Sequence, residues 1–175
     1  MEKRDIFDAQ RNNLNAPIVR GESIPEGCYV LSVSIFTVND KGEILLTLRA
    51  PEKPNFPNVW EITAGGALAG ESGIDAAVRE LREETGLKAA KEEMQLLRVI
   101  REPSAFVECY LYRTTLPVSA VVLQEGETVA ARFTSIKRFE ELMHTDGIAQ
   151  PVAFRYGVVR DALYDALGMD RHTEV

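Results

Sequence analysis

The sequence predicts an α/β (α+β) domain, and three observations carry that prediction. Short runs rich in β-branched and aromatic residues recur along the chain, with one helical pattern early and two late. The length of 175 residues suits one domain with a single good core. Hydrophobic residues at 45% and charged residues at 27% are ordinary globular values, which argues against disorder.

The N-terminal residues are expected to form a short hairpin within the same domain. Two apolar runs, Arg4 to Asp8 and Ala16 to Arg20, flank the turn-forming pair Asn12-Asn13. Pro17 places the second run at a sheet edge, because proline donates no backbone hydrogen bond. The chain is thereby divided into a hairpin with its lead-in, a main domain and a frayed tail: residues 1–28, 29–170 and 171–175.

The main domain begins with a strand expected at the centre of the sheet, Tyr29 to Val38, followed by a turn at Asn39 to Gly42. Thr134-Ser135 can cap one late helix, and Gly168 can end another. The remaining strands are expected at Glu43 to Arg49, Val59 to Thr63, Leu96 to Ile100, Phe106 to Tyr112 and Val129 to Phe133. The late helices are expected at Ile136 to Met143 and Ala153 to Leu167.

The early helix has clear start and stop signals. Ser72 followed by Asp75 is typical of a capped N-terminus, and Gly86 suits the left-handed residue that ends a helix. At about 100° per residue, one face of this helix should pack on a core. That face consists of Ile74, Ala77, Val78, Leu81 and Thr85.

A second face of the same helix carries Glu80, Glu83 and Glu84, because residues three and four apart are neighbours. The preceding turn offers only Gly73 and Ala76 on that side, so the carboxylates should stand beside a small surface. Such a surface leaves room for an ion and a ligand. A solvated acidic face is the ordinary alternative.

The surroundings of the helix favour an ion site. A strand-like run and the pair Gly65-Gly66 precede it, and Mg2+ prefers oxygen ligands shared between carboxylates, water and substrate phosphates. The stretch resembles the Nudix box, Gly-x5-Glu-x7-Arg-Glu-U-x-Glu-Glu-x-Gly-U, in which U is aliphatic. All specified positions match: Gly65, Glu71, Arg79, Glu80, Leu81, Glu83, Glu84, Gly86 and Leu87.

The resemblance implies a mixed β-sheet sandwiched between helices, with the box as a loop–helix–loop. It also implies a hydrolase that cleaves a nucleoside diphosphate linked to another moiety, or a related organic pyrophosphate. Water attacks phosphorus in this reaction, and Mg2+ or Mn2+ is the expected cofactor. The expected partner is therefore a small-molecule pyrophosphate substrate.

The resemblance also implies roles for the box residues. The expected metal ligands are Glu80, Glu83, Glu84 and the carbonyl oxygen of Gly65. Glu80 is alternatively the base that deprotonates water. Arg79 is expected to orient the glutamates by charge-assisted hydrogen bonds, with Glu71 as its structural partner. Gly86 has a structural role in the motif.

In this family the general base can instead lie on a loop outside the box. Glu127 is the preferred candidate, before Glu125 and Glu108, although a surface carboxylate is the commoner role for each. Arg49, Trp60 and Glu108 are candidates for contact with substrate. For Trp60 packing is the favoured alternative, and scattered surface arginines are common.

Stretches outside the box resemble Nudix proteins related to isopentenyl-diphosphate isomerase: Asp5 to Asp8, Arg20 to Gly27, Gly42 to Leu46 and Trp60 to Glu71. An isomerase needs a cysteine just after the tryptophan strand and histidine ligands for its metal. Thr63 to Gly66 occupy the first region here, and the histidines are His144 and His172. A hydrolase is therefore preferred over an isomerase. It is also preferred over a ligand-sensing Nudix domain, because such domains tend to lose box glutamates.

The charge balance disfavours a nucleic-acid polymer as partner, because the net charge is −7 and no Lys/Arg run is present. Cys28 and Cys109 form no Cys-x-x-Cys pair and suit two reduced thiols. No N-terminal apolar region or membrane-length run is visible, so we expect a cytoplasmic protein without membrane contact. A homodimer is left open.

Overall fold

The computed structural model describes residues 1–145 and 147–170, so the predicted frayed tail, residues 171–175, lies outside the described residues. The strands and helices are β1 (Lys3–Arg4), β2 (Ile6–Phe7), β3 (Ile18–Val19), β4 (Tyr29–Asn39), β5 (Ile44–Arg49), β6 (Trp60–Glu61), β7 (Thr63–Gly66), α1 (Gly73–Thr85), β8 (Met94–Glu102), β9 (Ala105–Thr114), β10 (Thr128–Thr134), α2 (Ile136–Met143) and α3 (Gln150–Leu167). Two 3-10 turns, Lys91–Glu93 and Val118–Ala120, complete the described elements.

The sheet is built around β4, as the apolar run from Tyr29 predicts. β9 runs parallel to β4 along one side, and β8 pairs antiparallel with β9. Along the other side of β4 lie β2, β7 and β5, all antiparallel to it, and β10 pairs with β5. The order β10-β5-β4-β9-β8 makes a mixed sheet, which confirms the predicted class.

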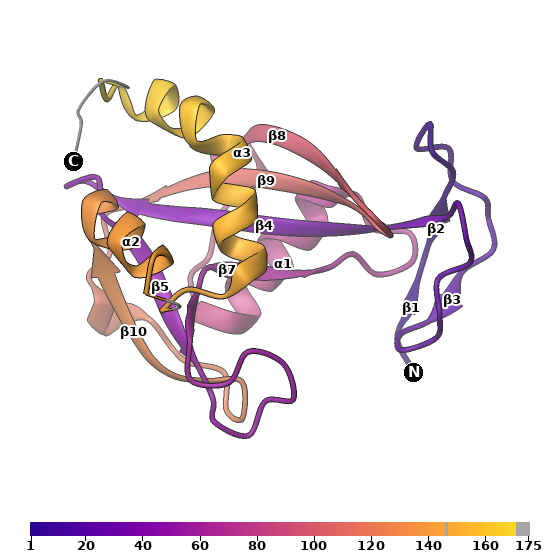
Figure 1. Ribbon diagram of the computed structural model, residues 1–175, viewed down its shortest axis with the longest axis horizontal. Coiled ribbons are helices and arrows are strands. Elements are labelled where there is room, and N and C mark those ends of the chain that lie inside the picture. Colours follow the sequence, from indigo (N-terminus) through magenta and orange to yellow (C-terminus); the bar gives the residue numbers. More distant parts are fainter. Residues whose placement is uncertain (146, 171–175) are drawn as a thin grey trace.

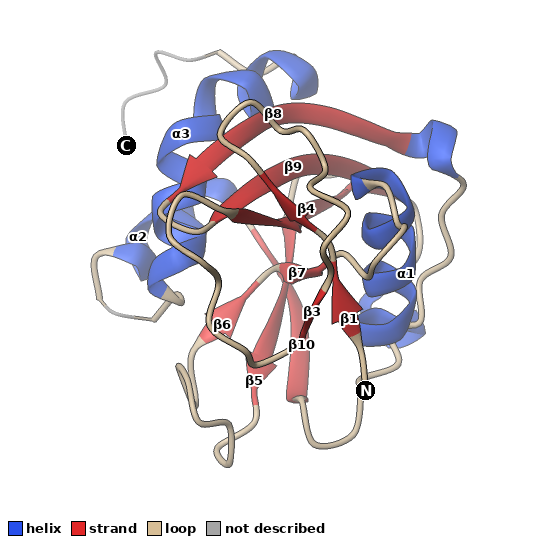
Figure 2. Ribbon diagram, turned by 90° about the vertical axis from the view of Figure 1, so that its right-hand side faces the viewer, coloured by secondary structure: helices blue, strands red, loops and turns tan. Residues whose placement is uncertain are grey.

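Helices cover both faces of this sheet. α1 lies on one face, and α2 and α3 lie on the other (Figures 1 and 2). Strand β4 contributes side chains to the cores on both faces of the sheet, because successive side chains of a strand point to opposite faces. Val33 and Ile35 join the core under α1, whereas Phe36 and Val38 join the core under α2 and α3. The sheet is therefore sandwiched between helices, as predicted.

The predicted strand Val59 to Thr63 is divided in two. β6 pairs with β5, whereas β7 pairs with β4, and the buried Ile62 stands between them. β5 pairs with β4 only at Val38 and Ile44, so β4 keeps a free edge for β7. This crossing brings Gly65 and Gly66 beside the middle of β4.

The predicted N-terminal hairpin is present, although its strands are shorter than the apolar runs. β1 pairs antiparallel with β3, with Lys3 opposite Val19 and Arg4 opposite Ile18. β2 leaves the hairpin and pairs with the start of β4. The hairpin therefore stands at one end of the sheet, on the right in Figure 1.

The predicted ends of α1 are confirmed, but one part of its predicted phase is wrong. Ser72 Oγ accepts a hydrogen bond from the Asp75 amide, and Gly86 ends the helix with φ 71°. Ala76, however, is fully buried in the core under α1, not beside an open ligand surface. At Gly73 an added Cβ would lie 1.9 Å from Glu108 Oε2. The small residues of the first turn therefore allow α1 to approach the sheet closely.

Ala76→Leu is accordingly expected to destabilise the fold by about 1–3 kcal/mol, because added volume strains a packed core. For a domain of this size, that loss lowers the melting temperature by roughly 2–4 °C per kcal/mol. Arg82→Leu, on the exposed side of the same helix, is the control and should melt close to wild type. Equal melting of Ala76→Leu and wild type would contradict the burial of Ala76.

Candidate active site

The site begins where β7 passes under α1. The carboxyl group of Glu80 lies directly over Gly65, and a Cβ added to Gly65 would be 2.0 Å from Glu80 Cδ. Only a residue without a side chain allows this approach. The fold therefore brings the loop backbone of Gly65 and the helix carboxylate of Glu80 together, two of the predicted metal ligands.

Arg79 joins the loop to the helix through a network of charged hydrogen bonds. Its Nε and Nη2 donate to the two Glu71 oxygens at 2.8 and 2.9 Å, and Glu71 Oε2 also accepts from the Leu68 amide. Nη1 donates to Glu80 at 2.9 Å and to Glu83 at 3.0 Å. Nη2 also donates to the Gly66 carbonyl at 3.0 Å. Arg79 thus orients three carboxylates and one backbone carbonyl at once.

Glu84 is the remaining box carboxylate of the last turn, and it is half-buried. Burial raises the pKa of Glu84 well above its ordinary value, and the negative charges of Glu61 and Glu80 raise it further. A backbone hydrogen bond from Ala64 acts in the opposite direction. No cationic side chain pairs with Glu84 in the described part of the chain. An ionised Glu84 therefore lacks a counterion of its own.

Glu61 and Glu80 complete a group of close carboxylates around Glu84. Burial raises the pKa of both, and their arginine partners, Arg49 and Arg79, oppose the shift. Mutual repulsion between such carboxylates is relieved when a cation joins them. The arrangement is thus suited to a positive ion between the loop and the end of α1.

The donor set can be tested against a divalent cation. Carboxylate and carbonyl oxygens are the ligands that Mg2+ prefers, and Glu84 offers a carboxylate without a cationic partner. Within residues 1–145 and 147–170, no three His, Cys, Asp or Glu side chains are already grouped to hold a metal ion. Glu80 and Glu83 instead accept from Arg79. The residue types fit the cation, because Glu80 and Glu83 each accept from Arg79 through one carboxylate oxygen, so the second oxygen of each can face a cation.

Arg49, a candidate for substrate contact, is occupied by partners within the chain. Its Nη1 donates to both oxygens of Glu61 at 2.7 and 2.8 Å. Its Nε donates to the carbonyls of Asn55 and Phe56, each at 3.1 Å. These bonds fix the proline-rich loop after β5. In this arrangement Arg49 positions Glu61 and the loop, and its contact with substrate stays a prediction.

Trp60 lies on the sheet face opposite α1. It packs against the core under α2 and α3, and its ring centroid is 4.0 Å from the guanidinium carbon of Arg132. Its backbone bonds to Gly147 and Ala149. These contacts agree with the packing alternative, and they separate Trp60 from the box carboxylates.

The three candidate loop bases lie in different places. Glu127 pairs with Lys53, and its charge is close enough to raise the pKa of Glu61 and Glu84. Glu108 instead bonds to Arg11 and Tyr110 beside the first turn of α1, roughly 16 Å along the helix from Glu84. Glu125 is exposed. Only Glu127 of the three is brought near the box carboxylates.

Sequence reasoning missed Glu61 and Lys53 as members of this site. A signal for Glu61 existed, because it is a charged residue inside the apolar run Val59 to Thr63. The ion pair between Lys53 and Glu127 joins residues far apart in the chain and has no local signal. The tertiary fold alone reveals it.

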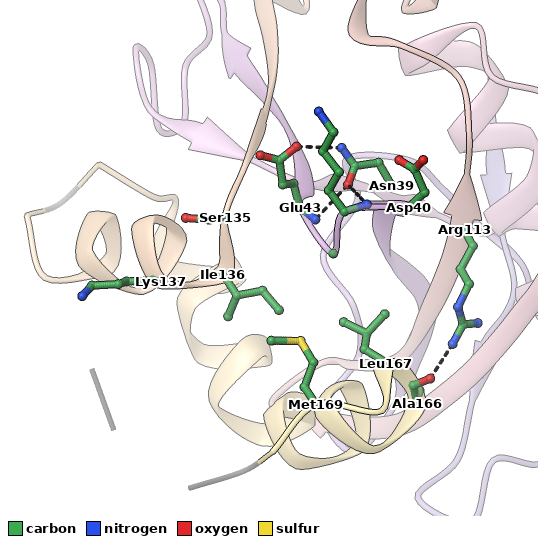
Figure 3. Close-up of a pocket in the computed structure, with 12 residues that line it drawn as sticks. Asn39, Asp40, Glu43, Arg113, Ser135, Ile136, Lys137, Ala166, Leu167 and Met169 are labelled. Atoms are coloured by element: carbon green, nitrogen blue, oxygen red, sulfur yellow. Dashed lines mark hydrogen bonds between the residues drawn. The ribbon is translucent and has the colours of Figure 1, made fainter. Parts of the chain in front are cut away.

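A hollow of about 640 Å3 lies away from these carboxylates. Figure 3 shows its lining by the turn after β4, the start of α2 and the end of α3, where Arg113 donates to the Ala166 carbonyl. None of the box residues lines it.

No helix in the described parts of the chain is long and apolar enough to cross a membrane.

Comparison with known proteins decides the family. A family model described as the NUDIX domain matches residues 29–153, which is most of the chain. The chain belongs to the Nudix family. This confirms the resemblance predicted from the box, and Nudix hydrolases act on small-molecule pyrophosphates, in general with divalent metals.

Individual relatives of this Nudix protein cover most or part of its length. An uncharacterised Nudix hydrolase of Listeria innocua is 29% identical over 143 residues, covering 81% of this chain and 85% of its own. The isopentenyl-diphosphate Delta-isomerase of Paenarthrobacter aurescens is 42% identical over 107 residues, covering 61% of this chain and 52% of its own. The solved structure of DR0079 from Deinococcus radiodurans has a TM-score of 0.75 at 19% identity, covering 92% of this chain and 99% of its own, so the Nudix fold is confirmed.

Proposed function

We propose that this Nudix protein hydrolyses the pyrophosphate bond of a nucleoside diphosphate linked to another moiety, or of a related organic pyrophosphate. The proposal includes dependence on Mg2+ or Mn2+ and attack of water on phosphorus. The observation that carries it is the meeting of Glu80, Gly65 and Glu84 at the end of α1, with Arg79 fixing the loop. A complete Nudix box whose glutamates did not meet at the glycine loop would support the proposed hydrolysis less strongly.

The residues of the chain divide the work as follows. Glu84 and Glu80 would hold the cation, with Glu83 and the Gly65 carbonyl as further oxygen donors. When bound, a divalent cation polarises a phosphoryl oxygen and lowers the pKa of bound water. Arg79 holds Glu80 and the Gly66 carbonyl in position through hydrogen bonds. Glu127 is proposed to take the proton from the attacking water.

Release of phosphate or nucleotide in the presence of Mg2+ tests the proposal. The panel consists of nucleoside diphosphate sugars, dinucleoside polyphosphates, nucleoside triphosphates and prenyl diphosphates. At least one is expected to be cleaved in a reaction that EDTA abolishes and Mg2+ restores. Absence of cleavage across the whole panel, with folded protein and either metal, would contradict the proposal.

An isopentenyl-diphosphate isomerase is the second candidate, supported by the 42% identity over 107 residues. Against it stands the chemistry of the cysteines. Cys109 faces the core under α2 and α3, and burial raises the pKa of its thiol to about 12, so it is a poor proton donor for the box site. Double-bond isomerisation of a prenyl diphosphate, without phosphate release, would favour this candidate.

A further inference from the structure

Arg4 of the N-terminal hairpin reaches the loop of the box. Its guanidinium lies over Gly66, where an added Cβ would be 2.3 Å from Nη2. The same nitrogen donates to Ser32 Oγ at 3.0 Å and to the Leu31 carbonyl at 3.4 Å. The carbonyl of Gly66 accepts from Arg79. Two arginines therefore converge on one glycine, one from the box and one from the hairpin.

Arg4 differs from the other arginines near the site because it has no carboxylate partner. Arg79 and Arg49 each form bidentate bonds with a glutamate. Arg4 makes no ion pair within the described residues, although the charges of Glu80 and Glu2 are close enough to raise its pKa, and its Nε is buried without a hydrogen-bond partner. A partly buried guanidinium with an unbonded nitrogen costs free energy, which a bound anion offsets.

Arg20 of the same hairpin adds a second positive charge. Its charge is close enough to lower the pKa of Arg4, although burial is the larger cause. Arg20 pairs with Glu2 at 2.7 Å, and both side chains of that pair are largely exposed. An exposed ion pair contributes little stability, on the order of 0–1 kcal/mol, so Glu2 is easily displaced. Arg20 is therefore available to another anion.

A small hollow lies between these groups. It is lined by Glu2, Arg4, Arg20, Gly66 and Leu68, and its volume is about 30 Å3. A hollow needs about 10–15 Å3 of such volume to hold one water molecule, so a single anionic oxygen atom fits it. Gly66 lines the hollow, and the adjacent residue, Gly65, lies under the Glu80 carboxyl group.

We propose that Arg4, assisted by Arg20, binds a phosphate group of the substrate on the hairpin side of Gly66. The inference rests on the proposed pyrophosphate hydrolysis and adds a substrate-binding residue to it. A guanidinium matches two phosphate oxygens at once, which a point charge does not. One phosphate group of the pyrophosphate then lies at the box glutamates and the adjacent one at Arg4.

Both arginines lie outside the range of the family model, which matches residues 29–153. The pairing of β1 with β3 sets them side by side at the end of the sheet. The hairpin thus supplies positive charge beside the box. This charge offsets the repulsion between a phosphate group and three of the box carboxylates.

The proposal is tested by measuring the affinity of the protein for inorganic pyrophosphate by calorimetric titration. The titration is carried out once in EDTA and once with Ca2+. Arg4→Met keeps the unbranched apolar part of the side chain and removes the guanidinium with its charge, and it is expected to weaken binding about tenfold or more. Lys3→Met is the matched control, because it removes the same charge from the exposed neighbouring residue of β1. Arg4→Lys should give an intermediate affinity, since it retains charge without the fork.

Several outcomes would overturn the inference. They are equal affinity of Arg4→Met and wild type, equal loss in Lys3→Met, or no binding to wild type under both conditions. If Arg4→Met melts early, Arg20→Met replaces it, because Arg20 is exposed; weakened binding supports the inference and unchanged binding contradicts it. Cleavage with unchanged KM in Arg4→Met contradicts this inference alone. Pyrophosphate binding through Arg4 without any turnover contradicts the proposed hydrolysis alone.

Discussion

Glu84→Gln is expected to reduce metal-dependent turnover by two or more orders of magnitude. Glu84 is half-buried, and within the described residues it pairs with no cationic side chain, so its charge is available to a bound cation. An amide keeps the shape of the side chain and removes that charge. Turnover is measured with the cleaved member of the substrate panel over a range of Mg2+ and Mn2+ concentrations.

The same variant should fold as well as wild type, or better. The pKa of Glu84 is raised in the folded protein, so its ionisation at neutral pH costs folding free energy that an amide does not. The melting temperature in EDTA is therefore expected to be equal or higher. Glu92→Gln, an exposed carboxylate outside the site, is the control and should alter neither property. Activity of Glu84→Gln within about tenfold of wild type would remove Glu84 from the ligand set.

Local signals explain what the sequence predicts correctly. Ser72 caps α1 and Gly86 ends it through contacts with residues a few positions away, so neighbouring letters are sufficient to predict both. The long apolar run of β4 likewise requires a buried central strand. The nine positions of the box then identify the family, and with it the sandwich of helices around a mixed sheet.

Non-local contacts explain what the sequence does not predict. The side of α1 that includes Ala76 depends on how closely the first turn approaches Glu108, a residue of β9. The division between β6 and β7 at Ile62 depends on which partner edge is free at each point of the sheet. Periodicity reports one element at a time, so neither result follows from it.

The same distinction applies to the site. The box supplies its carboxylates and Arg79 by spacing alone, but the other arginine and lysine side chains of the site come from outside the box. Arg49 meets Glu61 across the proline-rich loop, and Lys53 meets Glu127 across 74 positions of sequence. Arg4 reaches Gly66 from the N-terminal hairpin. Contacts between residues so far apart in the sequence leave no sequence pattern. Each of these charged side chains could equally well face solvent in another fold.

The identity of the general base is decided by comparing Glu127→Gln with Glu80→Gln. Glu80 lies over Gly65 and accepts from Arg79, which suits a ligand held in place. Glu127 stands on the loop before β10, near Glu84 and Glu61 but outside the helix. We therefore expect Glu80→Gln to weaken Mn2+ binding, and Glu127→Gln to leave it unchanged.

In the kinetics, Glu127→Gln should lower kcat by about 10²–10⁴-fold, the usual contribution of a general base, and flatten the acidic limb of the pH profile. Glu125→Gln is the matched control, because Glu125 is an exposed carboxylate of the same loop. Loss of the ion pair with Lys53 alone would lower stability and leave the pH profile unchanged. If Glu127→Gln keeps full kcat while Glu80→Gln loses it at unchanged Mn2+ affinity, the base lies in the box, and Glu127 serves only to hold Lys53.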